Sequence, residues 1–231
     1  MGDAPPHFDP ASLAELPDDL ALGRLPPGRH GLPRSFVVRN QRLRIVAAML
    51  RSLPEHGYAG TTISHLTHEA GVSRSAFYIQ FSSKEDCFLA TYDIAGEWFV
   101  ERIEEALVGD GELPERTRAA VTEALRLLAA NPSLARLFAI DAIQAGRASR
   151  ERQRGCLARI SAMLGAERGN RPQLPPELDE MLLDGALATI ARYVDSGRIE
   201  QLPEASEEMA RYLLTPYSGP EATDGILEES A

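Results

Sequence analysis

The 231-residue chain lacks the patterns that define several classes of protein. It contains two cysteines, Cys87 and Cys156, with no metal-binding spacing around them, which excludes a disulfide framework and indicates a reducing compartment. No apolar run approaches the roughly 18 residues of a membrane span, and acids and prolines stand where a signal peptide has a basic and then an apolar stretch. These absences predict a cytoplasmic protein.

Catalytic patterns are missing as well. No Gly-rich phosphate loop and no nucleophile elbow occurs in the sequence. His65, His68 and Glu69 follow one possible metal-ligand spacing, but the second glutamate–histidine arrangement of a zinc protease is absent. Histidines that face solvent or lie near a phosphate explain this spacing better. We therefore expect no enzyme, no bound metal and no cofactor.

The chain shows no strand alternation, and after residue 83 its apolar residues recur with helical spacing. We expect helices over residues 83–108, 114–131, 132–145, about 147–164, 177–196 and about 204–214. Two glycines and three prolines mark residues 165–176 as a boundary between helices. Because 44% of the residues are hydrophobic, a substantial core is available, and the pattern predicts an all-α fold.

Residues 57–89 predict two short helices joined by a tight turn and followed by a third helix. Thr62 and Ser73 suit the N-caps of the two short helices, since a side-chain oxygen there accepts from free backbone N–H groups. Gly71 suits the left-handed residue that ends the first short helix. Ile63, Leu66 and Ala70 form the apolar face of that helix.

The second short helix has an inner and an outer face. Phe77 and Phe81 face inward at i and i+4. Its outward-facing residues are Arg74, Ser75, Tyr78 and Ile79. A capping box of Ser82 and Glu85 is expected to open the third helix. Two helices across a glycine turn form a helix-turn-helix, whose second helix enters the major groove of DNA.

The segment from about Arg42 to Tyr92 resembles the DNA-binding domain of the TetR (tetracycline-repressor-like) family of bacterial transcriptional regulators. The matching residues, in the family's order and spacing, are Gly57-Tyr58, Thr61-Thr62, Ala70-Gly71-Val72-Ser73, Phe77-Tyr78, Phe81 and Lys84-Glu85. The resemblance implies an N-terminal three-helix helix-turn-helix domain followed by a larger helical ligand-binding and dimerisation domain. We expect an Arg-containing flexible extension over residues 1–38, the helix-turn-helix domain over 39–84, the regulatory domain over 85–215 and an acidic tail over 216–231.

The sequence departs from the family pattern at two positions. Gln80 stands where the family most often has histidine, so no capping or phosphate role is carried over to it. Pro54 falls in the last turn of the first helix, where its ring opposes the carbonyl of Leu50 and is expected to kink or shorten the helix.

The resemblance also implies roles in DNA binding. It assigns Tyr78 and Lys84 to phosphates and Thr62 to the backbone near a phosphate. Base edges are expected to meet Arg74, Ser75 and Ile79. The predicted DNA-contacting set is completed by Arg42 and Ser73.

Charge is distributed unevenly along the chain. Residues 20–84 hold nine basic and two acidic residues, whereas the whole chain has a net charge of −10. The basic end is therefore suited to approach phosphates and the acidic body is not. Arg24, Arg29 and Arg34 suit an arm along a DNA groove, and the equally supported alternative is a merely soluble extension.

Dimerisation residues are expected on the last two long helices. An apolar stripe there consists of Leu182, Leu183, Ala186, Leu187, Ile190, Tyr193, Val194, Met209, Tyr212 and Leu213. Such a stripe is more often ordinary core, but the resemblance implies pairing of two chains through these helices as a four-helix bundle. The partner is then a second copy of the chain, related by a two-fold axis.

A small-molecule pocket is implied between the DNA-binding domain and the dimer helices. The candidate lining residues are Trp98, Phe99, Arg102, Phe138, Asp141 and Gln144. Polar groups amid apolar neighbours suit a small apolar or amphipathic effector. The alternative is that the aromatic residues belong to the core and the polar residues face solvent.

These features predict a homodimeric, sequence-specific DNA-binding transcriptional regulator, a repressor that an effector releases from double-stranded operator DNA. The alternative is an interaction module whose acidic helical half binds a protein partner, with DNA binding retained or lost. An apolar cavity favours the first interpretation, and a filled core favours the second.

Overall fold

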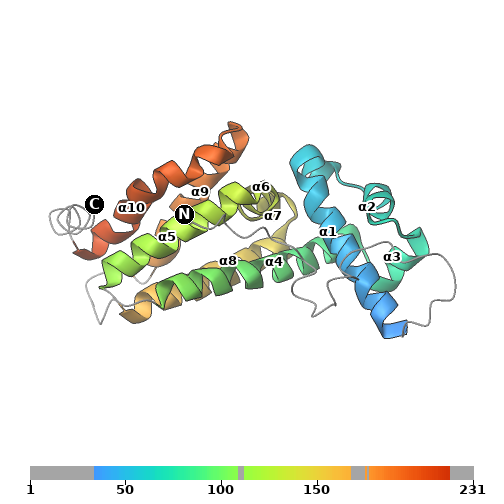
Figure 1. The fold of residues 1–231 in the computed structure, drawn as a ribbon, viewed down its shortest axis with the longest axis horizontal. Helices are drawn as coiled ribbons and strands as arrows, with labels where there is room; N and C mark the ends of the chain where they lie inside the picture. The colour runs from blue at the N-terminus through green and yellow to red at the C-terminus, as the bar shows by residue number, and fades with distance from the viewer. Residues whose placement is uncertain (1–33, 109–111, 168–174, 176, 219–231) are drawn as a thin grey trace, which may run out of the picture.

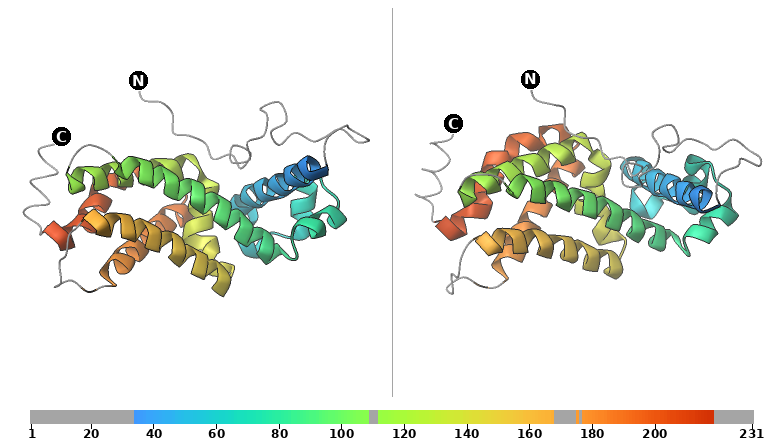
Figure 2. Two further views of the ribbon diagram at one scale, coloured as in Figure 1. Left: turned by 90° about the horizontal axis from the view of Figure 1, so that it is seen from below. Right: turned by 60° about the horizontal axis from the view of Figure 1, so that its bottom comes forward.

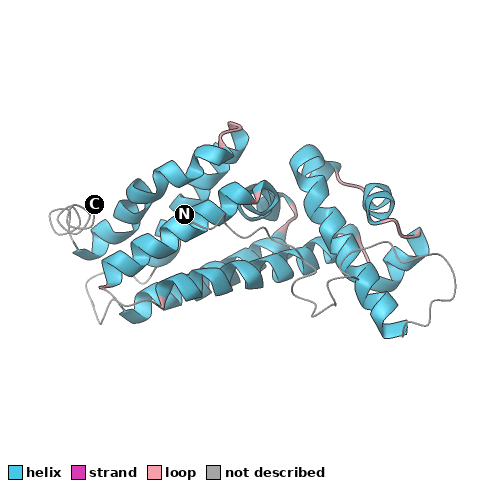
Figure 3. Ribbon diagram, in the orientation of Figure 1, coloured by secondary structure: helices cyan, strands magenta, loops and turns pink. Residues whose placement is uncertain are grey.

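The computed structural model describes residues 34–108, 112–167, 175 and 177–218, and these residues form helices and no strand (Figure 3). The predicted all-α fold, with a helix-turn-helix domain before a larger helical domain, is confirmed. None of the helices in the described ranges combines the length and the apolar character that crossing a membrane requires.

The first three helices form one end of an elongated molecule (Figures 1 and 2). They are α1 (Arg34–Gly60), α2 (Ile63–Ala70) and α3 (Arg74–Gln80), and are called the head below. The buried side chains of Leu53, Leu66 and Phe77, one from each helix, belong to the hydrophobic core. Helices of seven or eight residues, such as α2 and α3, are only marginally stable alone. Burial of their apolar side chains against α1 therefore stabilises them.

Helix α1 differs from the expectation at both ends. It begins at Arg34, so residues 34–38, assigned to the extension, belong to a helix; residues 1–33, with Arg24 and Arg29, lie outside the described part. The kink expected at Pro54 lies instead at Gly57, whose φ of 62° leaves the helical region while Pro54 stays inside the helix. Glycine adopts this left-handed φ without the clash that a Cβ would cause.

Within the described ranges, seven further α-helices form the body. They are α4 (Lys84–Leu107), α5 (Leu113–Ala130), α6 (Pro132–Arg136), α7 (Ala142–Gln144), α8 (Arg147–Glu167), α9 (Leu178–Asp195) and α10 (Ser206–Ser218). The long helix α4 leaves the head and packs between α5 and α8, while α9 and α10 close the other side (Figure 1). One helix therefore connects the head directly to the core of the body.

Three boundaries in the body differ from the predictions. The single helix expected over 132–145 is α6, a π-turn η3 (Leu137–Asp141) and α7, and a 3-10 segment η4 (Ile199–Ala205) precedes α10. Helix α8 continues to Glu167, and residues 168–174 and 176 of the expected loop lie outside the described part. Helix α10 includes residues 216–218 of the expected tail, whose residues 219–231 are likewise outside it.

Candidate nucleic-acid interface and effector cavity

Both predicted N-caps of the helix-turn-helix are confirmed. The Thr62 hydroxyl accepts from the backbone N–H of His65 at 3.1 Å, and the Ser73 hydroxyl accepts from that of Ala76 at 3.0 Å. Gly71 ends α2 with φ 60°, and its N–H donates to the carbonyl of His68. The turn between the helices is therefore fixed by local chemistry that the sequence encodes.

Helix α3 presents a polar and apolar face to solvent. Phe77 and Phe81 are buried, as predicted, whereas 51% of Tyr78 and 73% of Ile79 are exposed. Arg74 and Ser75 are exposed on the same helix. Exposure of an isoleucine side chain to water is unfavourable, but an apolar side chain can pack against the methyl group of thymine in the major groove.

Helix α3 is attached to α1 at its C-terminus. The Arg42 guanidinium donates to the carbonyl of Gln80 at 3.0 Å and lies 4.4 Å from the Phe81 ring centre. The Gln80 side-chain amide donates to the carbonyl of Val38 at 3.0 Å. In the free protein Arg42 thus orients the recognition helix, and its predicted contact with DNA stays a prediction. Gln80, to which no role was assigned from the sequence, joins two helices of the head.

Lys84 occupies the junction between the head and α4. Its ammonium donates to the carbonyls of Tyr58 at 2.8 Å and Thr61 at 3.0 Å, and lies 4.2 Å from the Tyr58 ring centre. Partial burial lowers the pKa of Lys84. A cation at the C-terminal carbonyls of α1 stabilises that helix end. The predicted phosphate contact therefore requires the Lys84 ammonium to bind a phosphate while it also donates to these carbonyls.

The N-cap of α4 lies one residue after the one predicted. Ser83, not Ser82, is the N-cap, and its hydroxyl accepts from the N–H of Asp86 at 3.0 Å. The Asp86 carboxylate in turn accepts from the backbone N–H of Ser82 at 2.7 Å. The pair Ser82 and Glu85 was wrong, because Ser83 caps the helix and the carboxylate of Asp86 bonds to Ser82, the residue before the N-cap, so the reciprocal box does not form.

Two of the three residues with a possible metal-ligand spacing, His65, His68 and Glu69, have other partners. The Glu69 carboxylate accepts from the Arg51 guanidinium at 2.7 Å. The His65 ring lies 4.7 Å from the ring of His56, centre to centre. Among the described residues, no group of three potential ligands is placed to hold a metal ion.

A buried carboxylate joins the head to the body. Asp141, at the end of the π-turn η3, is fully buried and accepts from the Tyr58 backbone N–H at 2.8 Å. Its other oxygen lies 3.0 Å from Nε of Arg136. Burial raises the pKa of Asp141, although the Tyr58 N–H and Arg136 favour its charged form. A π-turn widens the helix by one residue per turn and often occurs at functional sites.

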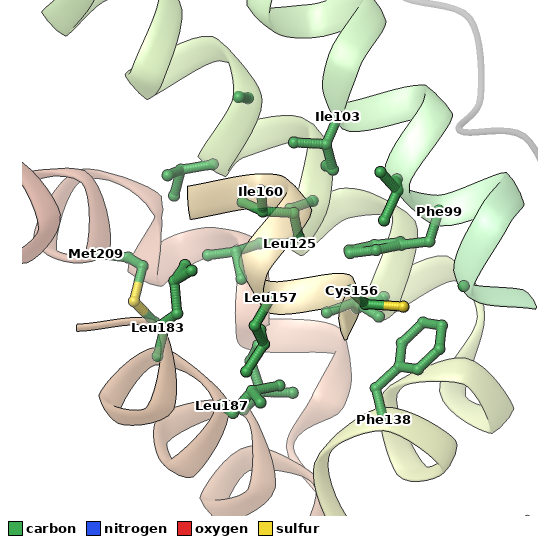
Figure 4. Close-up of a pocket in the computed structure, with 18 of the residues that line it drawn as sticks. Phe99, Ile103, Leu125, Phe138, Cys156, Leu157, Ile160, Leu183, Leu187 and Met209 are labelled. Carbon is green, nitrogen blue, oxygen red and sulfur yellow. The ribbon is translucent and has the colours of Figure 1, made fainter. Parts of the chain in front are cut away.

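The body contains an apolar cavity of about 120 Å³ (Figure 4). Residues of α4 and α5 form two of its walls: Gly96, Phe99, Val100, Ile103 and Leu107, and Thr117, Ala120, Val121, Ala124, Leu125 and Leu128. Each series covers eleven residue-to-residue steps, or roughly 16 Å of helix at 1.5 Å per residue. The cavity is therefore long and narrow.

Aromatic rings gather at one end of this cavity. The Phe138 ring centre lies 5.3 Å from those of Tyr92 and Phe99. Phe138 belongs to η3, and its carbonyl accepts from the Gln153 side-chain amide at 2.6 Å. Figure 4 shows Phe99, Phe138 and Cys156 directed toward one another. The turn that holds Asp141 thus also supplies part of the cavity wall.

The structure brings two of the six predicted ligand residues to the cavity, namely Phe99 and Phe138. Asp141 serves the contact with Tyr58, and Arg102 pairs with Glu105 at 2.7 Å. Gln144 is exposed, and Trp98 is buried on the face of α4 opposite the lining positions 96 and 100, roughly 160° from each at 100° per residue. These four assignments to the cavity wall were wrong, because the spacing of polar and apolar residues along a helix does not show which of its faces meets a cavity.

The predicted dimer stripe also falls largely on the cavity. Its residues that line the cavity are Leu183, Ala186, Leu187, Ile190, Met209 and Leu213. Leu182 is buried, and Tyr193 and Val194 are half-buried. Four of these six side chains are buried within their own chain, as expected of an ordinary core, and Ala186 and Leu187 are half-buried. The assignment of the stripe to dimer contacts stays a prediction.

A different face of α9 and α10 is exposed. Met181 is 65% exposed, Ala188 is exposed, and Tyr212 is 43% exposed. Met181 and Ala188 lie about 180° around α9 from the cavity-lining positions, at 100° per residue. A Cβ at Gly185 would overlap the Tyr212 hydroxyl, so α9 and α10 pack closely and share this surface.

A capped helix-turn-helix at one end and an apolar cavity at the other define a helix-turn-helix protein with a helical regulatory domain. Residues 45–91 match the profile described as "Bacterial regulatory proteins, tetR family". The HTH-type transcriptional repressor AcnR of Corynebacterium diphtheriae is 30% identical over 186 residues, which cover 74% of this chain and 92% of that repressor. The chain belongs to the TetR family of bacterial transcriptional regulators, as the resemblance indicated.

Further similarities concern regulators of fatty acid metabolism. The fatty acid metabolism regulator protein of Bacillus subtilis is 27% identical over 97 residues, so the match covers 42% of this chain and half the length of that relative. The fatty acid degradation regulator FadR from Bacillus halodurans superimposes with a TM-score of 0.68 at 20% identity, over 75% of this chain and 94% of that one. FadR from Bacillus subtilis, solved with stearoyl-CoA, gives 0.64 at 21% identity, over 77% and 98%. These structures show the same fold.

Proposed function

We propose that the chain is a homodimeric repressor that binds operator DNA through two copies of α3 and releases it when an apolar or amphipathic effector enters the cavity. The observation that carries this proposal is the π-turn η3, which contributes Phe138 to the cavity wall and Asp141 to the contact with the head. A single short segment thus touches both the effector site and the DNA-binding domain.

The DNA-binding half of the proposal rests on the exposed face of α3. Arg74, Ser75 and Ile79 project from a helix whose ends are fixed by Ser73 and Arg42. Side chains on a fixed helix reach base edges in the major groove with defined geometry. Tyr78 lies on the same face and is proposed to contact the phosphate backbone, which positions the helix without reading sequence.

A two-fold dimer is proposed through the exposed surface of α9 and α10. It presents Met181, Ala188 and Tyr212, and Gly185 lets Tyr212 of the same chain lie close to α9. The exposed Ala188 is small enough to allow close approach of a helix from a second chain. A two-fold axis then places two copies of α3 about one DNA turn apart, roughly 34 Å, or somewhat farther.

The effector is proposed to be chain-like and mainly apolar. The narrow cavity follows α4 and α5 and is lined almost wholly by apolar residues. An engineered apolar cavity of about 150 Å³ accepts benzene, while pockets for drug-sized ligands hold about 300–1,000 Å³. Since this cavity holds about 120 Å³, a longer chain enters only if the walls move apart. The stearoyl chain of the stearoyl-CoA in Bacillus subtilis FadR is a ligand group of this kind.

Movement of the walls is proposed to transmit the signal. Displacement of Phe138 shifts η3, and the Asp141 carboxylate at the end of η3 is bonded to Tyr58 of the head. Helix α4 lines the cavity and begins at Lys84, which is bonded to the same segment. Two heads held by one dimer surface then lose the spacing that the operator requires, to the extent that the effector prefers the released conformation.

The test begins with selection of bound fragments from the source genome, which yields an operator. Straight-chain alcohols and acyl thioesters are then screened for an increase in melting temperature, because binding to the folded state alone stabilises it. Operator affinity is measured with and without each ligand found. The expected result is a palindromic operator and weaker binding with ligand. A cavity ligand that leaves operator affinity unchanged contradicts the release mechanism, and a chain that prefers no sequence contradicts the repressor.

A further inference from the structure

The cavity wall contains a hydroxyl group that has no partner. Thr117, on α5, lines the cavity and is 1% exposed. Its Oγ1 makes no hydrogen bond to any described residue. Buried polar groups in folded proteins are nearly always hydrogen-bonded, and each unpaired one requires an explanation such as a missing ligand.

The other polar side chains of the wall have partners. The Gln153 amide donates to the Phe138 carbonyl at 2.6 Å. The Tyr92 hydroxyl and the Cys156 thiol are hydrogen-bonded to each other, and burial raises the pKa of both groups. Among the described lining residues, Thr117 therefore provides the hydroxyl that is open to a ligand.

Thr117 lies at the end of the cavity that is remote from the head. The connection between α4 and α5 is short, and the Arg116 guanidinium donates to the carbonyl of Leu107 at 3.3 Å, so the two helices run antiparallel. The first turns of α5 thus lie beside the end of α4, while Tyr92 and Phe138 lie at the opposite end. A ligand that contacts Thr117 can extend along roughly 16 Å of apolar wall toward Tyr92 and Phe138.

The wall also restricts the charge of the ligand. None of the described residues that line the cavity is Lys, Arg, His, Asp or Glu. A carboxylate or phosphate buried there would lose its hydration without gaining a countercharge, which is strongly unfavourable. An oxygen that hydrogen-bonds without a charge meets no such penalty.

We infer that the Thr117 hydroxyl anchors an uncharged hydroxyl or carbonyl oxygen of the effector, whose apolar chain extends along α4 and α5 toward Phe138. The inference rests on the proposed effector cavity and adds the chemical class of its ligand. It makes Thr117 a residue that determines specificity between plain hydrocarbons and chains that carry an alcohol, ketone, ester or thioester.

The experiment measures the dissociation constants of 1-octanol and of benzene for the wild-type chain and three variants. Thr117→Val keeps the shape and removes the hydroxyl, whereas Thr117→Ser keeps the hydroxyl. Ala124→Leu fills the cavity and serves as a control for binding there. Thr117→Val should weaken 1-octanol binding by about 2- to 12-fold, the net worth of one hydrogen bond, and should leave benzene binding unchanged. Thr117→Ser should retain 1-octanol affinity within about 2-fold.

A second measurement excludes a purely structural role. If the hydroxyl is unpaired in the free protein, Thr117→Val should keep or raise the melting temperature without ligand, because an unsatisfied polar group is removed. A lower melting temperature would mean that the hydroxyl has a partner within the protein, and would overturn the inference.

The outcomes separate the inference from the function on which it rests. Equal 1-octanol affinity of wild type and Thr117→Val overturns the anchor, while loss of binding in Ala124→Leu still supports the effector cavity. If neither probe binds the wild-type chain, both the anchor and the effector cavity are wrong. Operator binding without ligand is measured on the same samples and remains an independent test of the repressor.

Discussion

The backbone N–H of Tyr58 and the carboxylate of Asp141, 83 residues apart in sequence, are joined by a 2.8 Å hydrogen bond. Tyr58 follows the left-handed Gly57 in the head, and Asp141 closes the π-turn in the body. The bond lies where the two domains meet and is fully buried on the Asp141 side. A buried contact of this kind responds to small shifts of either domain.

Removal of this carboxylate should weaken the junction. Asp141→Ala leaves the Tyr58 N–H and the Arg136 guanidinium without their partner, and should lower the free energy of unfolding by about 2–3 kcal/mol. Arg147→Ala is the control, since it breaks an equally short but exposed pair with Glu151 and should cost less than about 0.5 kcal/mol. Urea denaturation measures both. Equal effects would contradict a structural role of the junction.

The same carboxylate predicts a pH dependence. Burial raises the pKa of Asp141 above its ordinary value of 3.8 in the folded chain. Between 3.8 and that higher pKa the folded state binds more protons than the unfolded state, so this group's stabilisation falls as pH rises. The stabilisation by Asp141 is complete below pH 3.8 and is lost as the pH rises through the pKa that Asp141 has in the folded chain.

The difference in unfolding free energy between wild type and Asp141→Asn isolates this dependence from other carboxylates. Asparagine keeps an acceptor for the Tyr58 N–H but does not titrate. Wild type should lose stability relative to Asp141→Asn as pH rises from about 4 to 7. A difference that grows in the opposite direction would show that Arg136 outweighs burial.

Two glycines should respond oppositely to the same substitution. A Cβ at Gly57 would lie 2.6 Å from Nη2 of Arg136, and φ is 62°. Gly57→Ala should therefore destabilise by about 1–2 kcal/mol. Gly155 lies inside α8 with nothing near its Cβ position, so Gly155→Ala should stabilise by about 0.5–1 kcal/mol. Thermal unfolding distinguishes the two, and a stabilising Gly57→Ala would contradict the close approach to Arg136.

The head could be predicted from sequence because its signals are local. Thr62, Gly71 and Ser73 lie within a few residues of the N–H and C=O groups that they serve, so spacing alone identifies them. The error at Ser82 and Glu85 shows the limit of this approach, since the neighbouring Ser83 caps the helix and Asp86 takes the bond to Ser82.

Contacts between distant segments could not be predicted in the same way. Asp141 has the spacing of a polar residue on an apolar helix, and nothing in that pattern indicates Tyr58 as its partner. The stripe on α9 is likewise apolar whether it faces a second chain or an internal cavity. Only the fold decides that Leu183 and Ile190 line the cavity and that Met181 is exposed.

Replacement of an exposed arginine on α3 should change sequence preference. Arg74→Ala should reduce binding to the selected operator by about 1–3 kcal/mol if the guanidinium contacts a guanine, with a much smaller effect on random DNA. Arg150→Ala, an exposed arginine on α8 in the body, is the matched control and should leave both affinities unchanged. Equal losses of Arg74→Ala on both DNAs would assign Arg74 to the phosphates instead.

A charge on the exposed face of α9 should separate the proposed dimer. Ala188 is exposed between Met181 and Arg192 on that face, and a glutamate there would meet its symmetry mate near a two-fold axis. Ala188→Glu should give a folded monomer by light scattering, and its affinity for a palindromic operator should fall toward that for a single half-site. Ala119→Glu, the same change at an exposed position of α5, should leave the dimer and its operator affinity intact. Because the cavity-lining side of α9 is untouched, Ala188→Glu should still bind the cavity ligand. A dimer that survives Ala188→Glu would place the interface elsewhere on the body.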